Sequence, residues 1–230
     1  RVAKTGNKES QKEEVILNSI VQDLENSKNI RSIDFSNDAY IKYIKPLQLL
    51  TDKPVLYVCN VDEESILTGN NYVEEVKKSI KDEFAEIIIL AAGIESEINE
   101  LSEHEERKMF LNDLGLDEPG SNKLIKSAYS LLGLQTYFTA GIKEVRAWTI
   151  PIGSKSSQAA GVIHSDFETG FIKTEVISYS DYISYGSELK VKEAGKMRVE
   201  GKDYVVNDGD VMHFLFNVWK KSTQFFCLVI

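Results

Sequence analysis

Residues 54–61 read PVLYVCNV, a nearly continuous apolar run. An apolar run this short predicts a β-strand buried on both faces of a parallel sheet. We expect a helix at 72–84, and the residues IIIL at 87–90 repeat the signal of a buried strand. A strand, a helix and a second strand in this order predict part of an α/β domain.

Capping signals outline the next two helices. Ser102 with Glu105 predicts a capping box for a helix that Gly115 ends. Ser121 is then expected to cap a further helix, which Gly133 ends.

The chain before residue 54 has the pattern of paired helices. Apolar residues recur at helical spacing within 8–26, and a second apolar stripe follows in 38–50. Pro46 is expected to bend or end the second helix. We interpret 1–53 as an antiparallel helical hairpin, a coiled coil entered partway.

From residue 134 onward the sequence favours strands, and it predicts a small mixed β domain that wraps a helix. A terminal hairpin is expected, in which 202–206 pairs with 211–218 through an Asp-Gly turn at Asp208 and Gly209. The other expected elements are strands at 144–150 and 172–178, and helices at 158–167 and 189–199.

The composition is that of a globular protein, since 42% of the 230 residues are hydrophobic and 27% are charged. No run of about 18 apolar residues occurs, and the first residues lack the apolar core of a signal peptide. We therefore expect an intracellular protein with no membrane contact. Two cysteines and three histidines without a cluster argue against a metal site.

The net charge of −9 is unevenly distributed: +1 over 1–53, −10 over 54–133 and 0 over 134–230. The middle region would repel nucleic acid, so any RNA contact is expected from the ends of the chain.

Polar residues directly follow the first buried strand. Asn60 and Glu63 could offer an amide and a carboxylate to a purine edge, because ligands bind at the carboxyl ends of strands in open α/β sheets. The alternative is a capped turn before a helix. After the second strand, Ala91 and Ala92 form a small-residue turn whose backbone N–H groups could meet a base, or which is simply a tight connection.

The 230 residues contain no G-x-x-x-x-G-K-[ST] motif, which in P-loop proteins cradles phosphates and orders magnesium. We therefore predict no catalytic residue and no metal ligand in them, and a complete nucleotide hydrolase is not encoded here.

A basic cluster near the C-terminus could engage RNA through cations and neighbouring tyrosines. The alternative is an ordinary solvated helix, because acidic residues alternate with the cations. The candidate nucleic-acid-binding residues are Lys190, Lys192, Lys196 and Arg198.

Three long runs resemble one known family, the YchF / Obg-like ATPases, which are translation-factor-class P-loop proteins. These runs are LGLDEPG (114–120), LQTYFTAGIKEVRAWTIPIGSKSSQAAGVIHSDFETGFI (134–172) and KEAGKMRVEGKDYVVNDGDVMHFLFNV (192–218). The resemblance implies a helical coiled-coil insertion (1–53), the latter part of a P-loop G-type nucleotide domain (54–133) and a ubiquitin-like β-grasp TGS domain (134–218).

The resemblance also implies roles for single residues. Asn60 and Glu63 match an altered base-recognition motif, in which the Asn60 side chain and the backbone at Val61 read the adenine edge. Ala91 and Ala92 match the small-residue base loop. The phosphate loop, the switches and the magnesium ligands have no counterpart here. The intact protein is expected to bind ATP, or GTP, with Mg²⁺, its phosphate site coming from an N-terminal half that is missing here.

The expected function is therefore that of the C-terminal part of a cytoplasmic, ATP-preferring, ribosome-binding ATPase in translation or the stress response. Its expected partner is the large ribosomal subunit or RNA. The alternative is a nucleotide-independent module that binds ribosomes, RNA or protein. Residues 219–230 depart from the family. Their last four, CLVI, match a prenylation pattern, although a sequencing or gene-model oddity is the preferred interpretation.

Overall fold

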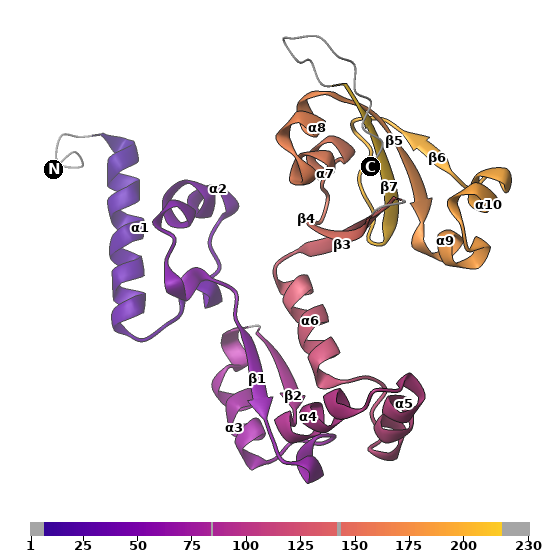
Figure 1. Cartoon of the computed structure of the whole chain (residues 1–230). Coiled ribbons are helices and arrows are strands. Elements are labelled where there is room, and N and C mark those ends of the chain that lie inside the picture. Colours follow the sequence, from indigo (N-terminus) through magenta and orange to yellow (C-terminus); the bar gives the residue numbers. More distant parts are fainter. Residues whose placement is uncertain (1–6, 84, 142–143, 218–230) are drawn as a thin grey trace. The chain divides into compact units, whose positions relative to one another are not determined.

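The computed structural model describes residues 7–83, 85–141 and 144–217. The chain divides into two compact units, Arg1–Leu131 and Leu132–Ile230 (Figure 1). Each unit is described separately below.

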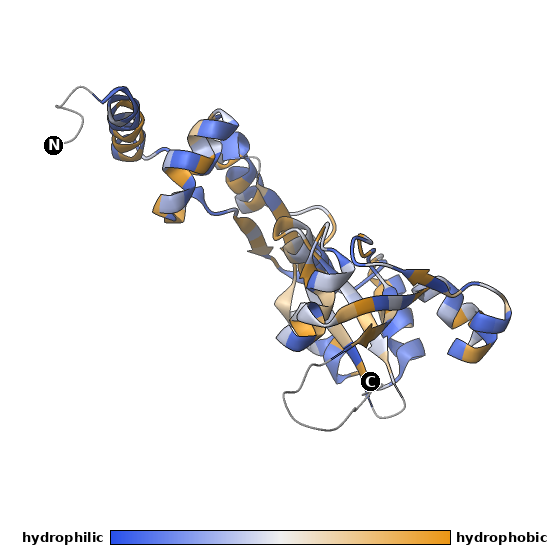
Figure 2. Ribbon diagram, turned by 90° about the horizontal axis from the view of Figure 1, so that it is seen from above, coloured by the Kyte–Doolittle hydropathy of each residue, from blue (hydrophilic) through white to orange (hydrophobic). Residues whose placement is uncertain are grey.

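The first unit begins with helix α1 (Lys8–Glu25), which confirms the first predicted helix. The Asn7 side chain caps it by accepting a hydrogen bond from the Glu9 N–H at 3.0 Å. Apolar and polar residues alternate around this helix (Figure 2), and its buried residue Ile20 packs with Ile30 and Ile44 in a small core.

The second arm of the predicted hairpin is not a regular α-helix. Its α-helical part, α2, covers only Asn37–Ala39, and a π-helical turn (Tyr40–Ile44) and a 3-10 turn (Lys45–Leu47) follow. Pro46 explains the change, because proline has no N–H to donate to the helix ladder. The expectation of two regular antiparallel helices is therefore wrong for the second arm.

The predicted strand, helix and strand are confirmed. Strands β1 (Leu56–Asn60) and β2 (Glu86–Leu90) pair in parallel, with Leu56 opposite Glu86 and Asn60 opposite Leu90. Helix α3 (Asn71–Ser79) lies between them in the chain. The expectation that both faces of the first strand are buried is wrong, because Val58 in β1 is 44% exposed. The described sheet has only these two strands, so one edge of β1 has no partner strand among the described residues.

Helices α4 (Ala92–Glu100), α5 (His104–Asp113) and α6 (Gly120–Leu131) complete the first unit. Gly115 ends α5 in the left-handed conformation, φ +71°, as predicted. The predicted capping box at Ser102 is wrong, because Glu103 occupies the N-cap position and no side chain caps the helix. Ser121 does not cap α6 either, because it lies inside the helix.

The second unit is a five-stranded mixed sheet in the order β4-β3-β7-β5-β6 (Figure 1). Helix α7 (Ser156–Ile163) packs against the sheet, and the shared core includes Tyr137, Ile150, Ala159 and Val176. The strands are β3 (Leu134–Ala140), β4 (Val145–Pro151), β5 (Phe171–Ser178), β6 (Arg198–Glu200) and β7 (Asp210–Phe216).

The predicted terminal hairpin is wrong, although its second strand exists as β7. Residues 202–206 form no strand, and only an isolated bridge joins Val205 to Lys155. Strand β7 pairs instead with β5 in antiparallel fashion and with β3 in parallel. The long-range partners bury both edges of β7, which a local hairpin partner could not do.

Two predicted helices are also shorter or divided in the structure. The helix expected at 189–199 is α10 (Glu188–Glu193), because Gly195 at φ +69° turns the chain into β6. The helix expected at 158–167 is α7 followed by α8 (Ser165–Thr169), with His164 in an extended conformation between them. Helix α9 (Tyr179–Tyr185) precedes α10.

Candidate functional site

The carboxyl ends of β1 and β2 bring the predicted base-contacting residues together. Asn60 ends β1 opposite Leu90, and the Val61 N–H donates a hydrogen bond to the Leu90 carbonyl oxygen at 2.9 Å. The pairing of the two strands therefore continues one residue past β1. This holds the backbone at Val61 beside the turn that starts α4.

Asn60 makes the contact that defines the site. Its side-chain Oδ1 accepts a hydrogen bond from the Ala92 N–H at 2.9 Å, across 32 residues of sequence. Ala92 is the first residue of α4, so this bond orients the Asn60 amide against the helix start. The amide NH₂ then remains as a donor group, and Asn60 is exposed rather than packed in the interior.

The turn after β1 is a capped turn that also leaves a polar side chain exposed. Asp62 is the capping residue: its Oδ1 accepts from the Ser65 N–H at 3.1 Å and starts the 3-10 turn Glu63–Ser65. Glu63 is exposed, and among the described residues its side chain has no hydrogen bond or ion pair. A capped turn is therefore present, and it leaves the Glu63 carboxylate open to a ligand.

The small residues after β2 have different environments. Ala91 is 2% exposed and belongs to the core that contains Ile94 and Ile98, so its side chain cannot reach a ligand. Ala92 is exposed, and its N–H is already used by Asn60. Their small size lets α4 start directly against the end of β1.

Sequence reasoning missed Glu95, which lies in the first turn of α4 and is half-buried. Its Oε1 accepts from the Gly120 N–H at 2.6 Å, and its Oε2 accepts from the Ser121 N–H at 3.1 Å. Glu95 therefore caps α6 in place of Ser121. No local sequence signal pointed to Glu95, because it lies 25 residues before Gly120.

This strand-end surface is open rather than enclosed. A cavity of about 400 Å³ in the first unit lies elsewhere, where Arg31, Tyr40, Asp52 and Glu83 form part of its lining. The lining of this cavity includes none of the strand-end residues. Recognition of a base depends on directed donors and acceptors, which the strand ends supply.

The second candidate surface lies in the second unit. Lys190 and Lys192 are on α10 and Lys196 follows it, and all three are exposed. Arg198 is on β6, where its guanidinium takes part in an internal network. The three lysines therefore remain candidates for RNA contact, whereas Arg198 also has a structural role within the second unit.

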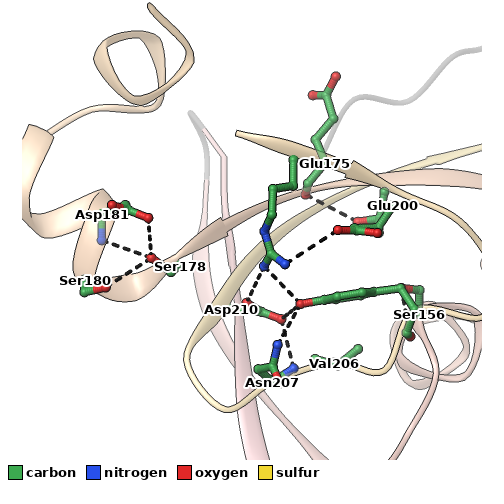
Figure 3. Close-up of polar contacts among 12 residues, drawn as sticks. Ser156, Glu175, Ser178, Ser180, Asp181, Glu200, Val206, Asn207 and Asp210 are labelled. Carbon is green, nitrogen blue, oxygen red and sulfur yellow. Dashed lines mark hydrogen bonds and ion pairs between the residues drawn. The ribbon is translucent and has the colours of Figure 1, made fainter. Parts of the chain in front are cut away.

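That network surrounds the carboxylate of Asp210, which is 3% exposed (Figure 3). Asp210 accepts from the Tyr204 hydroxyl at 2.7 Å and from the Asn207 N–H at 2.9 Å. Arg198 lies 3.5 Å from Asp210 and donates to the Tyr204 hydroxyl at 3.0 Å. Burial, together with the hydrogen bond to Asp210, raises the pKa of Tyr204.

The donor groups at the strand ends differ from those of a metal-binding cluster. Among them, no three histidine, cysteine, aspartate or glutamate side chains gather where they could hold a metal ion. The strand ends offer an amide, a backbone turn and one carboxylate, a donor set that suits a purine base better than a divalent cation. In the same described part, no helix is long and apolar enough to cross a membrane.

Comparison with known proteins gives close relatives over most of the chain. The ribosome-binding ATPase YchF of Pasteurella multocida is 52% identical over 216 residues, and that of Bacillus subtilis is 50% identical over 220 residues. These matches cover 94% and 95% of the chain, but only 59% and 60% of the relatives. The chain thus spans about three fifths of the length of the curated relatives it matches.

A family model named YchF-GTPase_C, described as a protein of unknown function (DUF933), matches residues 134–217. The solved structure of the Schizosaccharomyces pombe YchF GTPase superimposes with a TM-score of 0.75 at 36% identity, covering 90% of this chain and 55% of that one. The mixed α/β architecture described above is therefore that of a solved homologue.

Proposed function

This chain belongs to the YchF family, whose C-terminal part it matches, and from that premise we propose that it selects the base of a nucleoside triphosphate and docks a ribosome-binding ATPase onto its partner. The observation that carries the proposal is the hydrogen bond from the Ala92 N–H to Asn60 Oδ1. It fixes the Asn60 amide at the strand end, and the exposed Glu63 carboxylate lies three residues further along the chain.

Adenine suits this arrangement. An Asn amide can donate to a purine ring nitrogen and, with its second oxygen lone pair, accept from the adenine amino group. The Glu63 carboxylate adds an acceptor beside the backbone at Val61, whose own N–H is used by Leu90. We propose that Asn60, Val61 and Glu63 set a preference for ATP over GTP, with the exposed Ala92 beside the base and the buried Ala91 supporting the turn from the core.

Hydrolysis itself is assigned to the whole protein. Phosphoryl transfer in P-loop proteins depends on a phosphate loop, and the 230 residues contain no G-x-x-x-x-G-K-[ST] motif. ATP with Mg²⁺ would provide the reacting group. The contribution of this chain is to orient the nucleotide by its base, so that the triphosphate enters the reaction in one fixed position.

A substitution at Glu63 tests base selection. In the full-length protein, Glu63→Asp should lower the ratio of ATP affinity to GTP affinity by about tenfold, because a loss of about 1.4 kcal/mol of discrimination has this effect. Glu64→Asp, at an exposed neighbour in the same turn, is the matched control and should leave the ratio unchanged. An unchanged ratio in Glu63→Asp would refute the proposed base selection.

The second unit is the proposed docking part, with the ribosome, through its large subunit or RNA, as the partner in translation or the stress response in the cytoplasm. Its exposed lysines support this proposal. The combined substitution of Lys190, Lys192 and Lys196 by alanine should reduce co-sedimentation with ribosomes, and most strongly at low salt. Lys123→Ala with Lys126→Ala on α6 serves as the control. Arg198 is left intact, because its loss would disturb Asp210.

Co-sedimentation also distinguishes the proposed function from a second candidate. In that alternative the chain is a module that binds ribosomes, RNA or protein independently of nucleotide. The net charge of zero over 134–230 favours it less than a nucleotide-dependent partner contact, because a strong RNA surface is usually basic. If the full-length protein pellets with ribosomes equally with and without ATP and the 230-residue chain also pellets, the module is supported. If the 230-residue chain does not pellet at low salt, the module is rejected.

A further inference from the structure

We propose that Glu95 is a positioning residue for base selection, which holds the base-reading turn by fastening α4 to the start of α6. The inference rests on the proposed function and extends it to a residue outside the base-contacting set. Its basis is the two-point hydrogen bond from the backbone of Gly120 and Ser121 to the Glu95 carboxylate, at 2.6 and 3.1 Å.

The bond is a strong one for physical reasons. The first N–H groups of a helix have no partner within the helix, and the N-terminal end carries partial positive charge. A carboxylate that accepts two of these N–H groups satisfies both donors and the charge at once. Helix α6 has 12 residues, so its N-terminal field is well developed.

Gly120 allows this contact to be close. It is buried, and a Cβ atom at this position would lie 3.0 Å from both Leu90 Cβ and Glu95 Oε1. The start of α6 therefore lies directly against the last residue of β2 and against Glu95. Three segments meet here: the end of β2, the first turn of α4 and the first turn of α6.

The base-reading turn depends on this junction. The Glu95 N–H donates to the Ala91 carbonyl oxygen at 3.1 Å, so Glu95 lies in the same helical turn as Ala92, whose N–H bonds to Asn60. Asn60 holds the start of α4 from one side through Ala92, and Glu95 holds the same turn from the α6 side. Without the carboxylate, the first turn of α4 can shift and the orientation of the Asn60 amide is no longer fixed.

A positioning role predicts a specific loss rather than a general one. Glu95→Ala in the full-length protein should reduce the ratio of ATP affinity to GTP affinity by about tenfold, the effect of losing one charge-assisted hydrogen-bonded contact. Fluorescent analogues of the two nucleotides give both dissociation constants. Glu95→Gln keeps one acceptor oxygen and should lose about threefold, a partial rescue. Glu97→Ala, at an exposed position of the same helix, is the matched control.

A second readout checks the junction itself. In the 230-residue chain, amide hydrogen exchange at Gly120, Ser121 and Ala92 should become faster in Glu95→Ala and stay unchanged in Glu97→Ala. Equal weakening of ATP and GTP binding, with only a lower melting temperature, would show that Glu95 is merely structural and would overturn the inference. If the wild-type protein does not distinguish ATP from GTP, the proposed base selection fails and this inference fails with it.

Discussion

At the scale of single residues, Glu83 shows how burial and partners determine a charge in this fold. Its carboxylate accepts from Arg31 Nε at 3.0 Å and Nη2 at 2.7 Å, from the Tyr57 hydroxyl at 3.0 Å and from Asn29 Nδ2 at 2.7 Å. Burial alone would raise the pKa of Glu83, but the hydrogen bonds from Arg31 and Tyr57 outweigh it and hold the pKa below its usual value.

Removal of Arg31 should therefore be costly. The side chains of Arg31 and Glu83 are 14% and 15% exposed, so removal of Arg31 would leave a mostly buried carboxylate without its cationic partner. We expect Arg31→Ala to lower the free energy of unfolding by about 2 kcal/mol in urea titration, below the range for a fully buried pair. Lys28→Ala, which removes the exposed pair with Asp23, should cost about 0.5 kcal/mol or less.

The same pair predicts a pH dependence. The folded-state pKa of Glu83 is depressed, so its contribution to stability is present above the unfolded pKa of about 4.3 and is lost as the pH falls through the folded value. The difference between the wild type and Arg31→Ala should therefore shrink in acid. A difference that stays constant from pH 7 to about 3 would contradict this account.

At the scale of elements, the helix starts differ in whether their caps are local or distant. Helix α3 has a local cap, because Asn70 Oδ1 accepts from the Val73 N–H at 3.1 Å. Helix α6 has a distant one, Glu95, which is separated from Gly120 by 25 residues. Ser102, which has the residue type of a cap, precedes α5 without capping it.

These differences predict effects of different size for two similar substitutions. Asn70→Ala should destabilise the protein by about 1 kcal/mol, the usual cost of removing a capping side chain. Ser102→Ala should change the free energy of unfolding by less than about 0.5 kcal/mol, as expected for a surface substitution. Thermal unfolding followed by circular dichroism compares the two. A larger loss for Ser102→Ala than for Asn70→Ala would contradict the assigned helix starts.

At the scale of the whole molecule, the two units have separate hydrophobic cores. One lies around Ile94 and Ile98, with the Ile20 cluster in the same unit, and the other lies around Tyr137 in the mixed sheet. Tyr137 is fully buried, and its hydroxyl donates to the Ala159 carbonyl oxygen at 2.9 Å. Burial strongly raises the pKa of Tyr137.

Tyr137 should make the second unit sensitive to alkali. The unfolded tyrosine loses its proton near pH 10, whereas the folded one keeps it, so unfolding releases a proton and stability falls as the pH rises above about 10. Tyr137→Phe should lose about 1 kcal/mol at neutral pH with its hydrogen bond. It should also show a shallower alkaline loss than the wild type. Calorimetry from pH 7 to 11 measures both effects, and equal alkaline slopes in the two proteins would refute the role of Tyr137.

Much of the first unit follows from its sequence. The runs PVLYVCNV and IIIL predict β1 and β2. The strand-end position of Asn60 was also predictable, because it depends only on where a strand stops. The pairing of its side chain with Ala92 was not, because that contact joins residues 32 apart.

Sequence alone determined the segments whose burial is local: the amphipathic α1, the parallel strands β1 and β2, and the end of α5 at Gly115. Only the tertiary structure decided the partners of β7, the supporting role of Arg198 beside Asp210, and the capping of α6 by Glu95. The physical reason is that periodicity records which face of a segment avoids water, whereas hydrogen bonds between distant residues exist only after packing has placed their backbones within reach.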